Sequence, residues 1–154
     1  MIQRYVSKVS GPLLDRIDIH LEVPAVQYRE LRGGSAAEGS AEIRERVLAA
    51  RERQHERFAA EGERTKGSAR GASRQIYSNS QMNTQQIRVY CELSTDAERL
   101  LERAMQQQGL SARAHDRILK VARTIADLDA QHHIAVKHIA EAIQYRTLDR
   151  SYWS

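Results

Sequence analysis

Cysteine, proline and aromatic residues are scarce in this 154-residue chain, and each scarcity narrows the structures it can form. The single cysteine, Cys91, excludes an internal disulfide and a cysteine-rich zinc site. Only 5% of the residues are aromatic while 41% are hydrophobic, so aliphatic side chains must build the core, which favours packed helices. Both prolines, Pro12 and Pro24, lie near the N-terminus, and nothing after them carries the strongest helix breaker. We therefore expect a mainly α-helical protein.

Long apolar runs are also lacking. No stretch approaches the roughly 20 apolar residues that a membrane-spanning helix needs, and no secretory signal is recognisable. We therefore expect a cytoplasmic protein without a membrane partner. The 24 basic and 20 acidic residues give a net charge of +4, which is compatible with a polyanionic partner but is also typical of a solvated surface.

The sequence has no complete set of residues for catalysis. It contains no glycine-rich loop that could hold a triphosphate and no apolar run ending in paired acids that could hold its Mg²⁺, so we expect no ATP hydrolysis by this chain alone. His132, His133 and His138 invite a metal interpretation, but adjacent helical residues point in different directions and no cysteine or well-placed carboxylate accompanies them. We expect surface histidines and no metal site.

The first 24 residues differ in pattern from the rest. From residue 17 to residue 23, apolar and polar side chains alternate, which predicts a β-strand with one buried face. Because one isolated strand is not stable in water, we expect the rest of its sheet to lie upstream in a longer parent protein, with pairing inside a dimer as the alternative.

Residues 25–61 are predicted to be connecting helices, a short one over 25–31 and a long one over 40–61 with Ser40 as its N-cap. Ile43, Val47, Leu48 and Phe58 lie along one side of the long helix. Residues 62–81 are rich in Gly, Ser, Arg and Lys and are predicted to be a flexible basic linker. Disorder is the expected state of this linker, with phosphate contact and packing against another part of a larger protein as the alternatives. Three of its side chains are candidates for nucleic-acid contact: Lys66, Arg70 and Arg74.

A helical domain is predicted over residues 82–150, because apolar residues recur there at helical spacing and form core stripes rather than a cofactor site. Three of its helices have recognisable N-terminal caps: Asn83 with Gln86, Thr95 with Glu98, and Ser111. Gly109 is expected to end the second of these helices, and a last helix is expected around residues 136–143.

Two arginines stand where a guanidinium could contact phosphate. Arg16 lies between Asp15 and Asp18 just before the predicted strand, and it could project toward a phosphate or form a salt bridge with either acid. Arg113 lies in the first turn after Ser111, where backbone N–H groups favour an anion, although an ordinary surface arginine fits the same pattern.

Two long segments resemble a known family. Residues 5–24 (YVSKVSGPLLDRIDIHLEVP) resemble the last part of the nucleotide-binding core of magnesium-chelatase-like AAA+ ATPases, in particular the ComM/YifB group of competence-related proteins. Residues 109–149 (GLSARAHDRILKVARTIADLDAQHHIAVKHIAEAIQYRTLD) are similar to the C-terminal lid of that group, and residues 90–93 (YCEL) fit the segment before it. The resemblance covers nearly the whole chain and is weakest over 62–81.

This resemblance implies a fold and a set of roles. It implies one strand of the α/β core within residues 1–24, followed by an all-helical lid over 82–150. It assigns Arg16 to the arginine-finger position, which contacts the γ-phosphate held by the next subunit, and Arg113 to the sensor-2 position in its own subunit. The implied parent is a hexameric, DNA-acting branch-migration helicase that uses ATP and Mg²⁺ bound by an upstream core.

A different class of function stays open beside this one. The helix after Ser111 carries four basic side chains that could form a phosphate or groove-binding face: Arg113, Arg117, Lys120 and Arg123. A stand-alone helical DNA-binding module, or an adaptor that docks proteins, is therefore the alternative to a lid.

Overall fold

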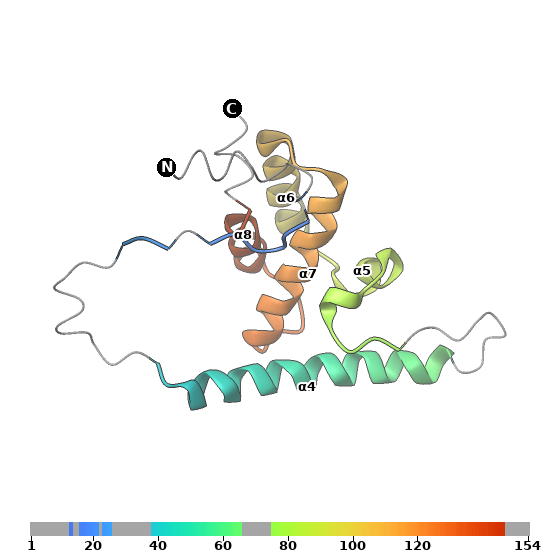
Figure 1. Cartoon of the computed structure of the whole chain (residues 1–154). Helices are drawn as coiled ribbons and strands as arrows, with labels where there is room; N and C mark the ends of the chain where they lie inside the picture. The colour runs from blue at the N-terminus through green and yellow to red at the C-terminus, as the bar shows by residue number, and fades with distance from the viewer. Residues whose placement is uncertain (1–12, 14–15, 22, 26–37, 66–74, 147–154) are drawn as a thin grey trace.

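The computed structural model describes residues 13, 16–21, 23–25, 38–65 and 75–146, with the side chains of 60–65 excepted. These residues form five α-helices and one short 3₁₀ helix (Figure 1): α4 (Ser40–Thr65), η1 (Asn79–Gln81), α5 (Thr84–Tyr90), α6 (Thr95–Gln108), α7 (Ala112–Leu128) and α8 (Val136–Gln144). No strand occurs within the described ranges, where residues 93 and 134 form an isolated β-bridge. The mainly α-helical class predicted from the sequence is confirmed.

The start of α5 shows how local sequence sets a helix boundary. The Asn83 side chain accepts a hydrogen bond from the Gln86 backbone N–H, and the Gln86 side chain accepts one from the Asn83 N–H, both at 2.9 Å. This reciprocal capping box satisfies two donors that would otherwise have no partner within the helix. The predicted cap at Asn83 is confirmed.

The start of α6 corrects the sequence interpretation by one residue. Ser94, not Thr95, is the N-cap: its hydroxyl accepts from the Ala97 N–H at 3.4 Å, and Thr95 is the first helical residue. An N-cap needs an extended backbone so that its side chain can turn back onto the first helical turn. Ser94 has that backbone, with φ −70° and ψ 157°.

Gly109 ends α6, as predicted. Its φ of 61° lies in the left-handed region, which glycine adopts without steric cost. The N–H of Leu110 then donates to the Met105 carbonyl at 3.1 Å, so the last turn of α6 is closed. Ser111 follows as the cap of α7, and its hydroxyl accepts from the Ala114 N–H at 3.1 Å.

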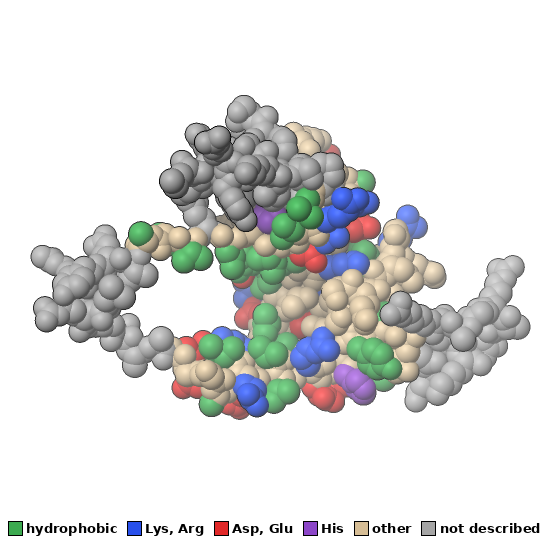
Figure 2. Space-filling model, in the orientation of Figure 1, with side chains coloured by type: hydrophobic (Ala, Val, Ile, Leu, Met, Phe, Trp, Pro, Cys, Tyr) green, Lys and Arg blue, Asp and Glu red, His purple; other side chains and the backbone are tan. Residues whose placement is uncertain are grey.

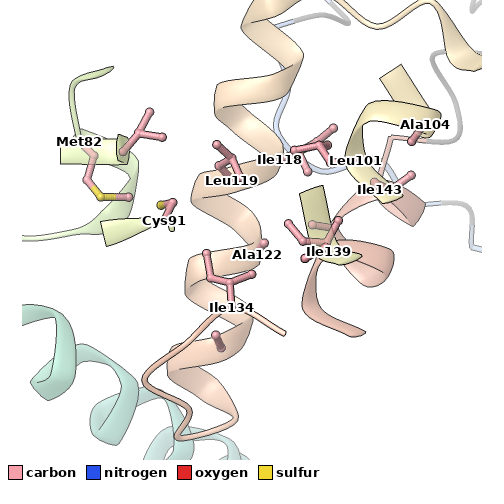
Figure 3. Packing of buried hydrophobic residues seen from close by; sticks show 14 of the residues in the cluster. Met82, Cys91, Leu101, Ala104, Ile118, Leu119, Ala122, Ile134, Ile139 and Ile143 are labelled. Carbon is pink, nitrogen blue, oxygen red and sulfur yellow. The ribbon is translucent and has the colours of Figure 1, made fainter. Parts of the chain in front are cut away.

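The helix α7 lies at the centre of the bundle, in contact with α4, α5, η1 and α8. Figure 3 shows aliphatic side chains of α7 between two sets of partners, Met82 and Cys91 on one side and Leu101, Ile139 and Ile143 on the other. The α7 residues in this core are two large side chains near the middle of the helix followed by two alanines: Ile118, Leu119, Ala122 and Ala126. The burial of these aliphatic groups is the main stabilising term of the fold.

The helix α4 runs along one edge of the bundle, and its N-terminal end extends past α7 (Figure 1). It begins at Ser40, which is its first helical residue and not its N-cap as predicted, and it ends at Thr65, four residues beyond the predicted end at 61. Ala50 and Phe58 are buried, and the Phe58 ring meets the Tyr90 ring edge-on at 5.7 Å. Of the apolar stripe predicted from the sequence, only Phe58 is therefore buried. Ile43, Val47 and Leu48 are exposed, because the bundle does not reach the N-terminal end of the helix.

The described part of the segment predicted as a strand, 17–23, forms no strand in this structure. Ile17, Ile19 and Leu21 are exposed whereas His20 is buried, which is the reverse of the expected alternation. The backbone bonds to the C-terminal end of the bundle instead: the His20 N–H donates to the Tyr145 carbonyl at 2.8 Å. A period-two pattern yields a strand only where a neighbouring strand accepts its hydrogen bonds, and none does so in the described residues.

Two other segments with a predicted structure lie partly outside the described residues. Residues 26–31 of the predicted short helix lie outside the described residues. Within the predicted linker 62–81, α4 continues through Thr65 and η1 lies against α7, with Asn79 buried. In the part of the chain that is described, none of the helices combines the length and apolarity required to cross a bilayer.

Candidate functional site

The N-terminal half of α7 presents basic side chains along one face. Arg113, Arg117 and Lys120 are spaced by four and three residues, so they lie above one another on the helix surface. Ser111 caps the helix at the same end, where the first backbone N–H groups point outward. The local sequence thus places positive charge and hydrogen-bond donors together.

A polar hollow of about 420 Å³ opens at this face, and we call it the α7 hollow. It is formed where three parts of the chain meet, namely the segment 16–21, η1 and the start of α7. Figure 2 shows basic and acidic side chains next to one another on the bundle. The residues that line the hollow are Asp18, Ser80, Ala112, Arg113, Asp116, Arg117 and Lys120.

Contacts inside the α7 hollow hold the side chains of Arg117 and Lys120. The Arg117 guanidinium forms an ion pair with the Asp18 carboxylate, 99 residues earlier in the sequence. The Lys120 ammonium donates to the Ser80 carbonyl at 3.0 Å, and partial burial lowers the pKa of this lysine. The second acid, Asp116, lies 3.1 Å from the His115 ring nitrogen.

The two arginines singled out in the sequence occupy different surroundings. Arg113 lies in the first turn of α7 and lines the hollow. Arg16 is exposed in a turn in which its N–H donates to the Leu13 carbonyl at 3.0 Å, two residues before Asp18. Asp18, rather than Arg16, is therefore the residue of that segment that reaches the hollow. The other three candidates lie outside the described residues: Lys66, Arg70 and Arg74.

A buried polar network, which the sequence interpretation missed, joins α4 and η1 to α7. Its centre is Asp127, which is fully buried. Its carboxylate receives both terminal nitrogens of Arg57, one of them at 3.0 Å, and the amide nitrogen of Asn79 at 2.8 Å. Arg123, one turn earlier on α7, pairs with it at 3.1 Å. The Arg123–Asp127 spacing of four is a local signal of a pair, but nothing local indicates that Arg57 and Asn79 join it.

The network also corrects the alternative DNA-binding face. Arg123 has only 2% of its surface exposed, and its guanidinium donates to the Gln131 and His132 carbonyls at 2.6 and 2.7 Å. It holds the loop between α7 and α8 and cannot contact a ligand at the surface. The face predicted for groove binding therefore loses one of its four basic side chains.

The histidines near α8 divide into two kinds. His132 and His133 are exposed as predicted, whereas the prediction for His138 is wrong because it is buried. Its Nδ1 accepts from the Ala135 N–H at 3.0 Å and its Nε2 lies 3.0 Å from Asp129, so it caps α8 from the inside. Hydrogen bonds from Lys137 and His138 lower the pKa of Asp129. The described residues contain no group of three or more metal-ligating side chains.

Two family profiles match this chain, and one of them covers the whole helical bundle. The profile of the family "Magnesium chelatase, subunit ChlI C-terminal" matches residues 37–146, which include all the helices described above. The chain belongs to this family. The profile "Magnesium chelatase, subunit ChlI" matches residues 1–31, the region that contributes Asp18 to the α7 hollow.

Several individual proteins are also similar to this chain over nearly its whole length. The chain is 39% identical to the competence protein ComM of Haemophilus influenzae over 150 residues, or 97% of this chain. It is 39% identical to YifB of Salmonella typhimurium over 148 residues, or 96% of this chain, and 34% identical to a Mycobacterium tuberculosis protein over 94% of this chain. In each case the match covers 26% of the relative, so this chain spans about a quarter of the length of these proteins.

Proposed function

We propose that this magnesium-chelatase-like chain is the C-terminal lid of an ATP-hydrolysing AAA+ protein, in which Arg113 contacts the nucleotide phosphate. The observation that carries the proposal is the α7 hollow. It combines a capped helix N-terminus with three basic side chains, which is the chemistry that a phosphoryl group requires.

The residues present fit the phosphate of ATP but not its metal ion. The hollow offers guanidinium and ammonium donors, whereas the described residues hold no cluster of acids or histidines for Mg²⁺. In this proposal ATP and Mg²⁺ are bound mainly by another part of a longer protein, and this chain contributes basic side chains that contact the phosphate. Arg113 acts as sensor 2 in its own subunit, and its position on α7 couples the orientation of the lid to the bound nucleotide.

Arg16 has a second role in the same proposal. It is exposed on the segment that precedes the bundle, where a guanidinium can reach a neighbouring subunit. There it would act as an arginine finger and stabilise the negative charge that develops during phosphoryl transfer. This role requires a ring of subunits, and we propose a hexamer.

The proposed parent acts on DNA in the cytoplasm. The name of the Haemophilus influenzae relative, competence protein ComM, favours a motor that acts on DNA during competence or recombination, such as a branch-migration helicase. The stand-alone DNA-binding alternative is less well supported, because Arg123 is buried inside the bundle.

A chimera tests the proposal directly. The region of the Haemophilus influenzae ComM that aligns with this chain is replaced by the 154 residues, and ATP hydrolysis and nucleotide binding are measured. We expect the chimera to hydrolyse ATP. Arg16→Ala should lower kcat by at least about 10³-fold with nucleotide still bound, as loss of an arginine finger does. Arg113→Ala should weaken nucleotide binding and lower turnover.

Arg103→Ala is the matched control, because Arg103 is an exposed arginine of α6 that does not line the hollow. It should leave ATP turnover unchanged. Full activity of the Arg16→Ala chimera would refute the finger assignment, and unchanged binding and turnover in the Arg113→Ala chimera would refute the sensor assignment.

A further inference from the structure

We propose that Asp18 is an internal competitor for the phosphoryl group that the α7 hollow binds. In this proposal an incoming phosphate displaces the Asp18 carboxylate from Arg117 and so removes one of the contacts that hold the segment of Arg16 to the bundle. The inference deepens the proposed function and rests on it for the identity of the anion as a nucleotide phosphate.

The first observation is where the Asp18 carboxylate lies. It pairs with Arg117 inside the hollow, so its oxygens occupy a guanidinium that a phosphate in the same hollow would contact. A carboxylate and a phosphate bind a guanidinium through the same kind of paired oxygens. An anion in the hollow and Asp18 therefore compete for one donor.

The second observation is that this pair is easily broken. The side chains of Arg117 and Asp18 are 27% and 47% exposed, so solvent screens their attraction and the pair stabilises the fold only weakly. A phosphate would also contact Lys120, which a single carboxylate on Arg117 does not. Contact with both basic side chains favours the phosphate over Asp18.

The third observation links the hollow to the proposed finger. Asp18 is two residues from Arg16, whose turn is closed by the hydrogen bond to the Leu13 carbonyl. The same segment is held on its other side by the His20 N–H, which donates to Tyr145. The Arg146 guanidinium also donates to the Ile17 carbonyl, so loss of the Asp18 contact removes one anchor of the segment of Arg16 while Arg146 and His20 still hold it to the bundle.

Pyrophosphate titration of the whole chain tests the competition. We expect Asp18→Asn to bind pyrophosphate roughly two- to five-fold more tightly than the unmodified chain, the gain that the loss of a surface ion pair allows. Asp116→Asn is the matched control, because Asp116 lines the same hollow and carries the same charge but does not pair with Arg117. If both substitutions give the same gain, charge alone explains it and the competition is refuted.

A double-mutant cycle isolates the contact itself. In an Arg117→Gln background, Asp18 has no guanidinium to occupy, so Asp18→Asn should give no gain beyond that of Asp116→Asn. An equal gain in both backgrounds would refute the proposal. So would the absence of any pyrophosphate binding to the unmodified chain and to Asp18→Asn at low ionic strength.

Amide relaxation reports how far loss of the Asp18 contact loosens the segment around Arg16. Pyrophosphate should make the backbone amides of residues 16–19 more mobile in the unmodified chain, and Asp18→Asn should do so without pyrophosphate. Asp116→Asn should leave those amides unchanged in the absence of pyrophosphate. Unaltered relaxation at residues 16–19 in saturating pyrophosphate would refute the link to Arg16.

Two ligands distinguish the source of the phosphate and separate this proposal from the function above. ADP should reproduce the effects of pyrophosphate. If only a short oligothymidylate does so, the competition stands and the nucleotide assignment falls. If ATP hydrolysis by the chimera depends on Arg113 while Asp18→Asn changes neither affinity nor mobility, the lid assignment stands and the competition falls.

Discussion

Replacing Asp127 with alanine should destabilise the bundle far more than removal of an exposed carboxylate. Asp127 is fully buried and accepts hydrogen bonds from Arg57, Arg123 and Asn79. Without it, two guanidinium groups face one another with no anion between them. The side chain of Arg123 is 3% exposed and that of Arg57 16%, so neither gains much compensating hydration.

The size of the effect follows from which partner is removed. Breaking a buried ion pair by deleting one member typically costs about 3–5 kcal/mol, because the remaining charge stays desolvated. Arg57 can turn partly toward water, whereas Arg123 cannot, so we expect the lower end, about 3 kcal/mol. A loss of that size is a large fraction of the roughly 5–15 kcal/mol that stabilises an ordinary domain.

Urea unfolding of the whole chain, followed by circular dichroism of the helices, measures this loss. Asp96→Ala is the matched control, since the Asp96 side chain is 81% exposed and lies 3.9 Å from Arg99. Its removal should cost less than about 1 kcal/mol. If Asp127→Ala unfolds within about 1 kcal/mol of the unmodified chain, the network does not hold α4 to α7 as argued.

Two further predictions concern single positions in the bundle. Gly109→Ala should cost about 1–2 kcal/mol through the backbone alone, because φ is 61° and an added Cβ meets no atom within 4 Å; urea unfolding measures it. Burial raises the pKa of Cys91 to about 12, so at pH 8 its alkylation by iodoacetamide in the folded chain should be about 1,000-fold slower than that of a thiol with an ordinary pKa. The folded chain keeps this proton longer than the unfolded chain, so the free energy of unfolding should fall as pH rises above 9.

Each of these two predictions has an outcome that would contradict it. Gly109→Asn is the control for the first, because asparagine enters the left-handed region more readily than alanine; a cost equal to that of alanine would show that backbone strain is not the cause. For the second, the chain unfolded in urea provides the reference rate. Equal alkylation rates in the folded and unfolded chains would show that Cys91 is accessible.

The helix starts could be predicted because their causes lie within four residues. Asn83 and Gln86 form a capping box, and Ser111 bonds to the residue three positions on, so the sequence alone contains both partners. Gly109 is similar, since a left-handed residue after a helix is most often glycine. Two cap predictions were wrong: Thr95 was given in place of Ser94, and Ser40, given as the cap of the long helix, lies inside α4. In both cases the hydroxyl residue lies at the helix start, and only the backbone geometry separates the cap from the first helical residue.

The hollow and the network could not be predicted, because their members are far apart in the sequence. Asp18 and Arg117 are separated by 99 residues and Arg57 and Asp127 by 70. No periodic pattern relates such positions, and only the packing of α4 and the N-terminal segment against α7 brings them together. The basic face of α7 was visible in the sequence, but the burial of Arg123 was not.

The short helix η1 connects the buried network to the α7 hollow. Asn79 bonds to Asp127 inside the bundle, while the carbonyl of the next residue, Ser80, accepts from Lys120 at the hollow. The Thr124 hydroxyl closes the link, since it accepts from Asn79 at 3.1 Å and donates to the Lys120 carbonyl at 2.9 Å. Adjacent residues in a three-residue 3₁₀ helix cannot move independently. The wall of the α7 hollow is therefore positioned by the same buried carboxylate that anchors α4.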